Sequence, residues 1–145
     1  MRKELAKRTK EAVRGALREG VLPGGGLALL DLRPVLQEKV RLAQDTDERV
    51  AYKILQKAVE VPIRTLLNNS GHHPETILAQ MAQSRSGYGF DVTCGKITDM
   101  NQAGVVDAAS VVKTALGSAI QSAALALTID VLIQRANPPM GVKRQ

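Results

Sequence analysis

Hydrophobic and polar positions recur with helical spacing at the start of the chain. Over residues 3–19 the apolar side chains fall on one face, and Lys3, Lys7, Lys10 and Arg14 form a stripe on the other. Gly20 follows as a helix stop signal. We therefore predict a lead-in helix within residues 1–20. Its apolar face comprises Leu5, Thr9, Ala12, Val13, Ala16 and Leu17.

Prolines and capping residues divide the next stretch. The apolar run 27–32 predicts a second helix, which Pro34 bends or shortens because proline lacks an N–H and clashes with the preceding turn. The run 45–48 supplies an N-cap and first-turn acids for a long helix. Pro62 lies within this helix and is expected to kink it, and residues 68–71 end it.

The second half of the chain combines helices with a glycine-rich region. A short helix is expected over about residues 74–82. Glycines and serines interrupt residues 84–105, which predicts loops with a small hairpin through 88–92 and 96–98. A last long helix is expected over about 108–133, followed by a tail over 134–145.

These elements predict an all-α fold in one domain over residues 1–145. Aromatic residues make up 2% of the chain, so leucine, valine, isoleucine and alanine must form the core. The most apolar segment, 115–133, carries Gln121 and Asp130 and predicts a buried helix that does not span a membrane. No membrane is therefore expected among the partners.

The excess of positive charge is concentrated at the start of the chain. The formal net charge is +6 at pH 7, and residues 1–20 hold seven basic and three acidic side chains. Such a stripe binds nucleic acid or a membrane in some proteins, but it is more often a solvated face. The shortage of aromatic rings also argues against a module that stacks single-stranded bases. Nucleic acid is therefore not the expected partner.

The cysteine content and the first residues suggest a cytoplasmic protein. Cys94 is the single cysteine, which excludes an internal disulfide and a cysteine-built zinc site and suits a reducing compartment. Met1 leads into charged residues instead of the apolar run of a signal peptide. Without a basic neighbour closer than Lys96, Cys94 is interpreted as a buried or idle thiol.

Three other features allow a chemical and a structural interpretation. The glycines 24–26 open a helix, where bare backbone suits an anionic ligand, although a tight turn for helix packing is favoured on local evidence. The adjacent His72 and His73 do not share a helix face, so an exposed loop is favoured over a metal site. Asp107 is most simply a helix N-cap, and its carboxylate is also able to accept hydrogen bonds from a ribose.

Five motifs, in order over about residues 9–133, resemble the C-terminal part of the equatorial domain of group I chaperonins, the GroEL type. The first is Glu19–Leu29 around the three glycines. Residues 58–64 are similar to the family's A-x-E-x-P-x-R helix, and residues 69–74 to its N-x-G-x-x-P turn. Residues 87–91 resemble its Y-G-[YF]-[ND] loop, and residues 99–107 resemble D-M-x-x-x-G-[IV]-x-D before the last helix.

The resemblance implies a helical domain that binds ATP or ADP and makes the subunit contacts of a ring. It places Gly24 and Gly25 against the nucleotide and Asp107 at the ribose. The residues implied on the adenine side are Phe90, Asp91, Val92 and Thr93, with Leu66 and Val105 nearby. It also implies subunit contacts at Arg64 and at His73, where the family has an acidic residue.

The chain departs from the family pattern in ways that limit its expected activity. The family's phosphate- and metal-binding loop is missing, so Mg²⁺ would be held only through the missing N-terminal half of the domain. An ungapped alignment places Arg8 where the family has its catalytic aspartate, and Glu11 substitutes only with a gap. No catalytic or metal-binding residue is therefore assigned, and we expect no ATP hydrolysis by this chain alone.

The missing parts and the uncapped first helix suggest a piece of a longer chaperonin. Unfolded proteins would be bound through that parent, and the chain itself would contact copies of itself or other chaperonin subunits. Apolar surface left uncovered by the missing half predicts self-association. Two alternatives stay open: a stand-alone, chaperonin-derived oligomerisation protein without ATPase activity, and a basic helical module that binds nucleic acid.

Overall fold

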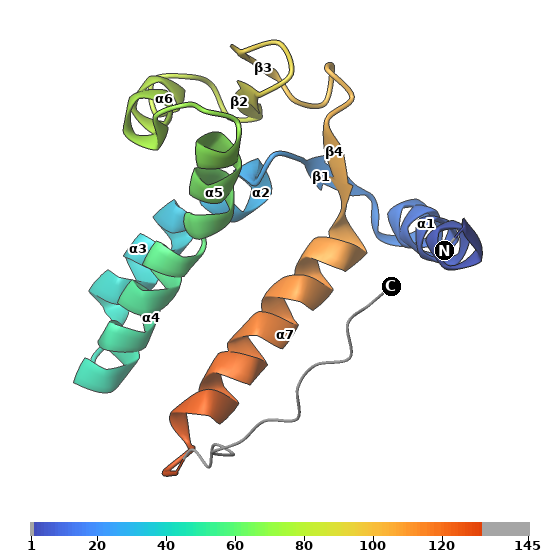
Figure 1. Cartoon of the computed structure of the whole chain (residues 1–145). Helices are drawn as coiled ribbons and strands as arrows, with labels where there is room; N and C mark the ends of the chain where they lie inside the picture. Colours follow the sequence, from blue (N-terminus) through green and yellow to red (C-terminus); the bar gives the residue numbers. More distant parts are fainter. Residues whose placement is uncertain (1, 132–145) are drawn as a thin grey trace, which may run out of the picture. The chain divides into compact units, whose positions relative to one another are not determined.

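A computed structural model describes residues 2–131 and shows a mainly helical chain with four short strands in that range (Figure 1). The chain divides into two compact units, Met1–Val112 and Lys113–Gln145. The prediction of one domain stays a prediction, because much of the second unit, including the predicted tail over 134–145, lies outside the described residues.

The first helix is confirmed as α1, Arg2–Glu19, and Gly20 ends it with a φ of +83°. None of its residues is buried. Ala12, Gly15 and Ala16 are half-buried, so this face lies against the rest of the unit. A Cβ on Gly15 would stand 2.1 Å from the Ser110 hydroxyl oxygen, so glycine allows this close approach.

Both prolines begin helices instead of bending them. The second helix is the single turn α2, Leu27–Leu30, and Pro34 lies in the first turn of α3, Arg33–Leu42. The long helix predicted through Pro62 is wrong: α4 ends at Ala58, and Pro62 lies in the first turn of α5, Val61–Asn69. Proline suits a first turn because the N–H that it lacks would have no partner there.

The start of α4, the short helix and the hairpin lie where capping residues and loop signals predicted them. Asp45 caps α4, Thr46–Ala58, and accepts a hydrogen bond from the Glu48 N–H at 3.3 Å. Helices α3 and α4 pack side by side (Figure 1). The short helix is α6, Pro74–Met81, and the hairpin joins β2, Tyr88–Asp91, to β3, Lys96–Asp99.

A second strand pair was not predicted. Strand β1, Val21–Pro23, pairs antiparallel with β4, Val106–Ala108, so that Leu22 lies opposite Asp107. This pair joins the segment after α1 to the segment before α7. The hairpin and the helices α2, α5 and α6 enclose the main core, in which Ile63, Leu67 and Met100 are almost fully buried. The other core residues are Leu27, Ile77, Met81 and Phe90.

The last helix differs most from its prediction. It is α7, Ala109–Leu127, and it ends six residues before the predicted limit of 133. We expected a buried helix, but Ala109 is its one buried residue, and Leu125 and Leu127 are 69% and 86% exposed. Within residues 2–131, α7 is a helix whose length and composition would suffice to cross a membrane. Core helices of soluble proteins have the same length and composition, so this observation assigns no membrane.

Candidate functional site

The glycine turn lies between two distant parts of the chain. The Gly24 N–H donates to the Val105 carbonyl oxygen at 2.9 Å, which extends the pairing of β1 with β4. A Cβ on Gly24 would stand 3.0 Å from that same oxygen, so a side chain there would push the two segments apart. Packing within the chain therefore gives Gly24 a structural reason to be glycine.

Gly25 joins this turn to the core. It has a φ of +66°, a backbone angle that residues with a side chain rarely adopt. A Cβ there would stand 2.9 Å from the Met100 methyl carbon. The Leu66 side chain and the Phe90 carbonyl oxygen both lie 4.0 Å from that position. The structure thus gathers five of the sequence-predicted nucleotide residues around one turn. They are Gly24, Gly25, Leu66, Phe90 and Val105.

The hairpin residues divide into core and turn positions. Phe90 is 6% exposed, and Val92 packs against the core. The Asp91 carboxylate accepts hydrogen bonds from the Thr93 N–H at 2.8 Å and the Thr93 hydroxyl at 2.6 Å. These bonds, first of all the one from the hydroxyl, hold the pKa of Asp91 below its usual value. Asp91 and Thr93 therefore order the turn through each other.

Asp107 is not the N-cap of the last helix. It lies in β4 opposite Leu22, and α7 begins two residues later. Pairing with β1 holds residues 106–108 extended, which moves the helix start beyond Asp107. Its exposed carboxylate follows Val105 by two residues in an extended segment, so both side chains point to the same side.

One aromatic contact was missed by sequence reasoning. The His72 ring meets the Phe90 ring edge-on, with centroids 4.7 Å apart and planes at 76°. The expectation of two exposed loop histidines therefore holds for His73 and fails for His72, which is half-buried. No local pattern signals this pair, because the hairpin that carries Phe90 meets His72 only through tertiary packing.

Arg64 is engaged in an ion network within the chain. It pairs with Glu60 of the preceding turn and with Glu75 of α6, the latter at 2.8 Å. Glu60, with a side chain 12% exposed, also pairs with Arg33 at 2.7 Å. The hydrogen bonds that Arg64 donates, first to Glu60 and then to Glu75, raise the pKa of Arg64. We call Arg33, Glu60, Arg64 and Glu75 the α3–α5–α6 network. His73, the other predicted subunit contact, is exposed and lies just before α6.

The described residues offer few groups for metal or acid–base chemistry. Among residues 2–131, no three histidine, cysteine or acidic side chains gather in a way that would hold a metal ion. Arg8 and Glu11, the residues considered for the catalytic position, lie on the exposed α1. They pair there with Glu4 and Arg14, each at 3.9 Å.

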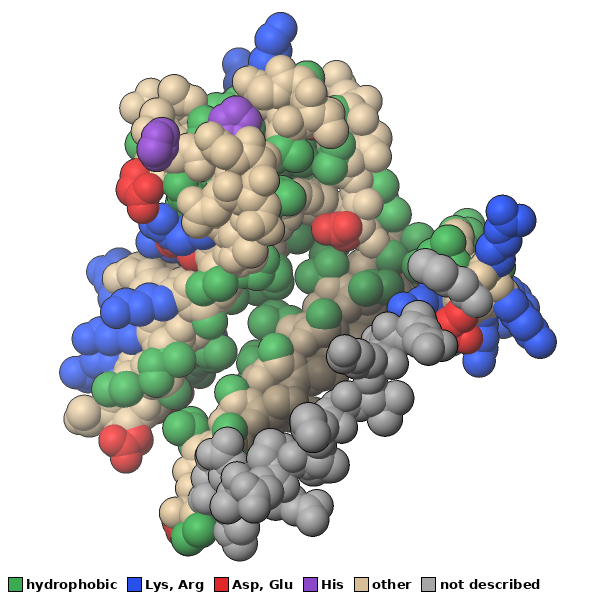
Figure 2. All heavy atoms as spheres, in the orientation of Figure 1, with side chains coloured by type: hydrophobic (Ala, Val, Ile, Leu, Met, Phe, Trp, Pro, Cys, Tyr) green, Lys and Arg blue, Asp and Glu red, His purple; other side chains and the backbone are tan. Residues whose placement is uncertain are grey.

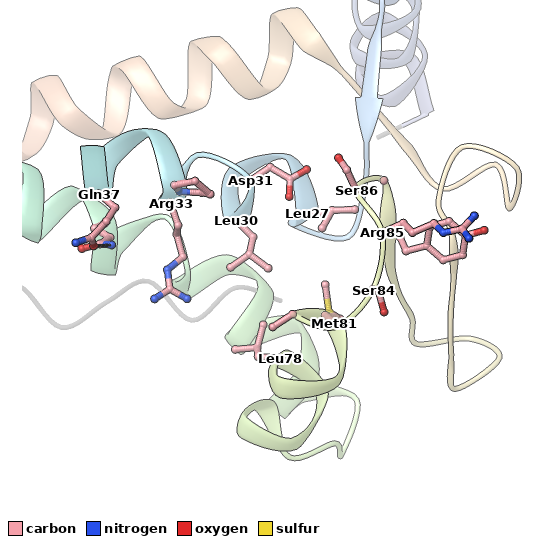
Figure 3. A pocket seen from close by; sticks show the side chains of 15 residues that line it. Leu27, Leu30, Asp31, Arg33, Gln37, Leu78, Met81, Ser84, Arg85 and Ser86 are labelled. Carbon is pink, nitrogen blue, oxygen red and sulfur yellow. Dashed lines mark hydrogen bonds between the residues drawn. The ribbon is translucent and has the colours of Figure 1, made fainter. Parts of the chain in front are cut away.

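An open groove lies on another side of the core. Its volume is about 610 Å³, and Leu30 of α2 and Leu78 and Met81 of α6 line it (Figure 3). Arg33 and Gln37 of α3 and residues 84–88 complete its walls. Burial raises the pKa of Asp31 at its edge. None of the nine residues implied at the nucleotide lines this groove, so it is separate from the glycine turn.

The comparisons with known proteins show the family of the chain. Residues 3–137 match the model of the TCP-1/cpn60 chaperonin family. Among solved structures, the chain is similar to the open-state monomer of a group II chaperonin from Methanococcoides burtonii, with a TM-score of 0.69 and 25% sequence identity. The match covers 75% of this chain and 28% of that protein, so the chain spans less than a third of its length. The chain belongs to the TCP-1/cpn60 chaperonin family.

Proposed function

We propose that this chain supplies half of an ATP or ADP pocket, together with subunit contacts, to a chaperonin that folds other proteins with ATP. The observation that carries the proposal is the gathering of Gly24, Gly25, Leu66, Phe90 and Val105 around one turn. Gly24, Gly25, Phe90 and Val105 come from three separate motifs of the resemblance, and Leu66 lies in α5 between two others. Their convergence in space supports a common role.

The chemistry of this cluster suits a nucleotide. The apolar side chains of Leu66 and Val105 are half-buried beside the turn and offer a surface for a base. Asp107 presents an exposed carboxylate, an acceptor for ribose hydroxyls, on the strand that follows Val105. Phosphate and Mg²⁺ ligands would come from the part of a chaperonin that this chain does not cover, so the chain alone is proposed not to hydrolyse ATP.

Within the family, we propose a group I, GroEL-type relationship. Five ordered motifs of that group support it, whereas the similar solved chaperonin belongs to group II. The proposed partners are copies of this chain or other chaperonin subunits, with unfolded proteins bound by the parent assembly. A cytoplasmic location is part of the same proposal and is supported by the lone cysteine.

Binding of a fluorescent ADP analogue to the 145-residue chain tests the proposal. We expect weak binding that EDTA does not change, because no Mg²⁺ ligand is assigned to this chain. Asp107→Asn should weaken it at least tenfold, and the matched control Asp47→Asn, on the exposed first turn of α4, should leave it unchanged. Absent binding, or equal effects of the two variants, would contradict the proposed half-site.

Exposed apolar side chains favour one second candidate, a stand-alone oligomerisation protein without ATPase activity. Leu17 of α1, Ile54 of α4 and Leu125 of α7 are 83%, 58% and 69% exposed. Contiguous exposed apolar surface is typical of interfaces. Sedimentation velocity over a hundredfold concentration range should show self-association, and stable oligomers without ADP binding would favour this candidate over the nucleotide half-site.

A further inference from the structure

Five cations form a continuous stripe along α1. Lys3, Lys7, Lys10, Arg14 and Arg18 are spaced by four, three, four and four residues. At 3.6 residues per turn they occupy about a quarter of the helix circumference over a length of about 22 Å. We call these five residues the α1 stripe. Lysine and arginine side chains gather over this helix in the space-filling view (Figure 2).

The α1 stripe faces away from the first unit. The half-buried residues Ala12, Gly15 and Ala16 mark the inner face of α1, and Gly15 lies against Ser110. Helical geometry places the stripe roughly opposite this face. All five stripe residues are exposed. The helix is therefore attached by its small residues and presents its cations to solvent.

Little negative charge compensates the stripe. Arg14 has a carboxylate neighbour, Glu11, at the long distance of 3.9 Å, and both side chains are more than 60% exposed. Within residues 2–131, no ion pair involves Lys3, Lys7 or Lys10. Exposed pairs at such distances contribute little. The stripe therefore keeps most of its positive potential for an external polyanion.

Charge complementarity indicates the partner. Contrary to the expectation from the sequence, we propose that the α1 stripe binds the phosphate backbone of double-helical nucleic acid without reading its sequence. Regularly spaced phosphates match a row of cations. Single strands are disfavoured because α1 carries no aromatic ring for base stacking. Ala12 and Ala16 are half-buried, but Leu5, Val13 and Leu17 of α1 are 66%, 53% and 83% exposed, so an anionic membrane surface is the competing partner that the vesicle arm of the experiment below tests.

Binding of a labelled 20-base-pair duplex to the full 145-residue chain, followed by fluorescence anisotropy, tests this inference, which does not rest on the proposed function. Five phosphate contacts predict a slope of about −4.5 in a plot of log K against log salt, or a loss of roughly 500-fold between 50 and 200 mM. The variant K3Q/K7Q/K10Q/R14Q/R18Q should lose at least 100-fold in affinity at 50 mM salt.

A matched variant separates the stripe from net charge. K39Q/R41Q/K53Q/K57Q/K96Q removes five exposed cations outside α1 and should keep binding within threefold. Circular dichroism confirms that each variant is folded. Equal losses in the two variants, tighter binding to a single-stranded 20-mer, or binding to phosphatidylserine vesicles without binding to the duplex would each overturn the proposal, as would no duplex binding at 50 mM salt.

Discussion

The edge of the His72 ring rests against Phe90, with the ring centroids 4.7 Å apart and the planes at 76°. This contact joins the turn before α6 to the hairpin, and Phe90 itself is a member of the core. Its geometry is the T-shaped arrangement that aromatic pairs prefer. The contact therefore stabilises the turn against the hairpin side of the proposed nucleotide half-site.

Loss of this ring contact should reduce stability. His72→Ala is expected to lower the free energy of unfolding by about 1 kcal/mol, the usual contribution of an edge-on aromatic pair. Urea denaturation followed by circular dichroism measures this change. His73→Ala removes the exposed neighbour and should stay within about 0.5 kcal/mol of the parent chain. Similar losses in both variants would show that the ring contact contributes nothing specific.

Alanine substitutions at two glycines with the same φ distinguish backbone strain from steric crowding by a neighbouring side chain. Gly25 and Gly95 both have a φ of +66°, but only Gly25 has a neighbour, the buried Met100, where a Cβ would stand. Gly95→Ala should cost about 1–2 kcal/mol from the left-handed conformation alone. Gly25→Ala should cost about 1–3 kcal/mol more because Met100 must move. Equal melting temperatures for the two variants would exclude crowding at the turn.

The α3–α5–α6 network should depend on its central carboxylate. Glu60 accepts from Arg33 and Arg64, and its side chain is 12% exposed. Glu60→Gln removes the charge and should destabilise the chain by about 1.5–3 kcal/mol, the range for hydrogen bonds to charged groups. Glu38→Gln breaks an exposed pair with Arg41 and serves as the control in urea denaturation. A loss for Glu38→Gln as large as that for Glu60→Gln would contradict a central role of Glu60.

Two carboxylates predict a loss of stability in acid. Hydrogen bonds, the largest from its own backbone N–H, lower the pKa of Glu75 from 4.5, and Thr93 lowers the pKa of Asp91 from 3.8. The carboxylates of Glu75 and Asp91 therefore bind protons more readily in the unfolded chain than in the folded one. Both carboxylates stabilise the fold when the pH is above their unfolded-state pKa values. This contribution is lost as the pH falls below 4.5 and then below 3.8 toward the lower folded-state pKa values.

Thermal unfolding between pH 2 and pH 7 measures this dependence. The double variant Glu75→Gln and Asp91→Asn should be less stable than the parent chain at pH 7 and should lose less stability in acid. The variant Asp47→Asn, which changes a carboxylate outside these contacts, should keep the parental profile. Parallel pH profiles for the double variant and the parent chain would show that neither carboxylate contributes.

Local signals explain which parts of the fold could be predicted. Gly20 and the Asp45 cap act within one turn, so the limits of α1 and the start of α4 followed from the sequence. Pro34 was expected to bend or shorten a helix and Pro62 to kink one, but each lies in the first turn of a new helix. Whether a proline lies inside a helix or at its start depends on which neighbouring turn is stabilised by packing. The pairing of β1 with β4 had no local signal because the strands lie far apart in the chain.

The candidate site also combines residues that the sequence indicated with contacts that only the folded chain shows. The resemblance identified Gly24, Gly25 and Val105, and the structure brings them together. The assignment of Asp107 as an N-cap failed because a distant strand holds it extended. His72 carried no signal, since its partner Phe90 is supplied by tertiary packing. Arg64 was recognised as a conspicuous cation, but its carboxylate partners in α5 and α6 became visible only in the folded chain.

The pairing of Val21 with Ala108 also determines when the first unit can close during synthesis. More than eighty residues separate the two strands, so β1 waits without its partner until nearly the whole unit has left the ribosome. Contacts this distant slow folding, because the intervening chain must be ordered before they form. A nascent chain that stops anywhere before residue 106 would hold its glycine turn without the strand that fixes it, which makes β4 the last step in building the proposed half-site.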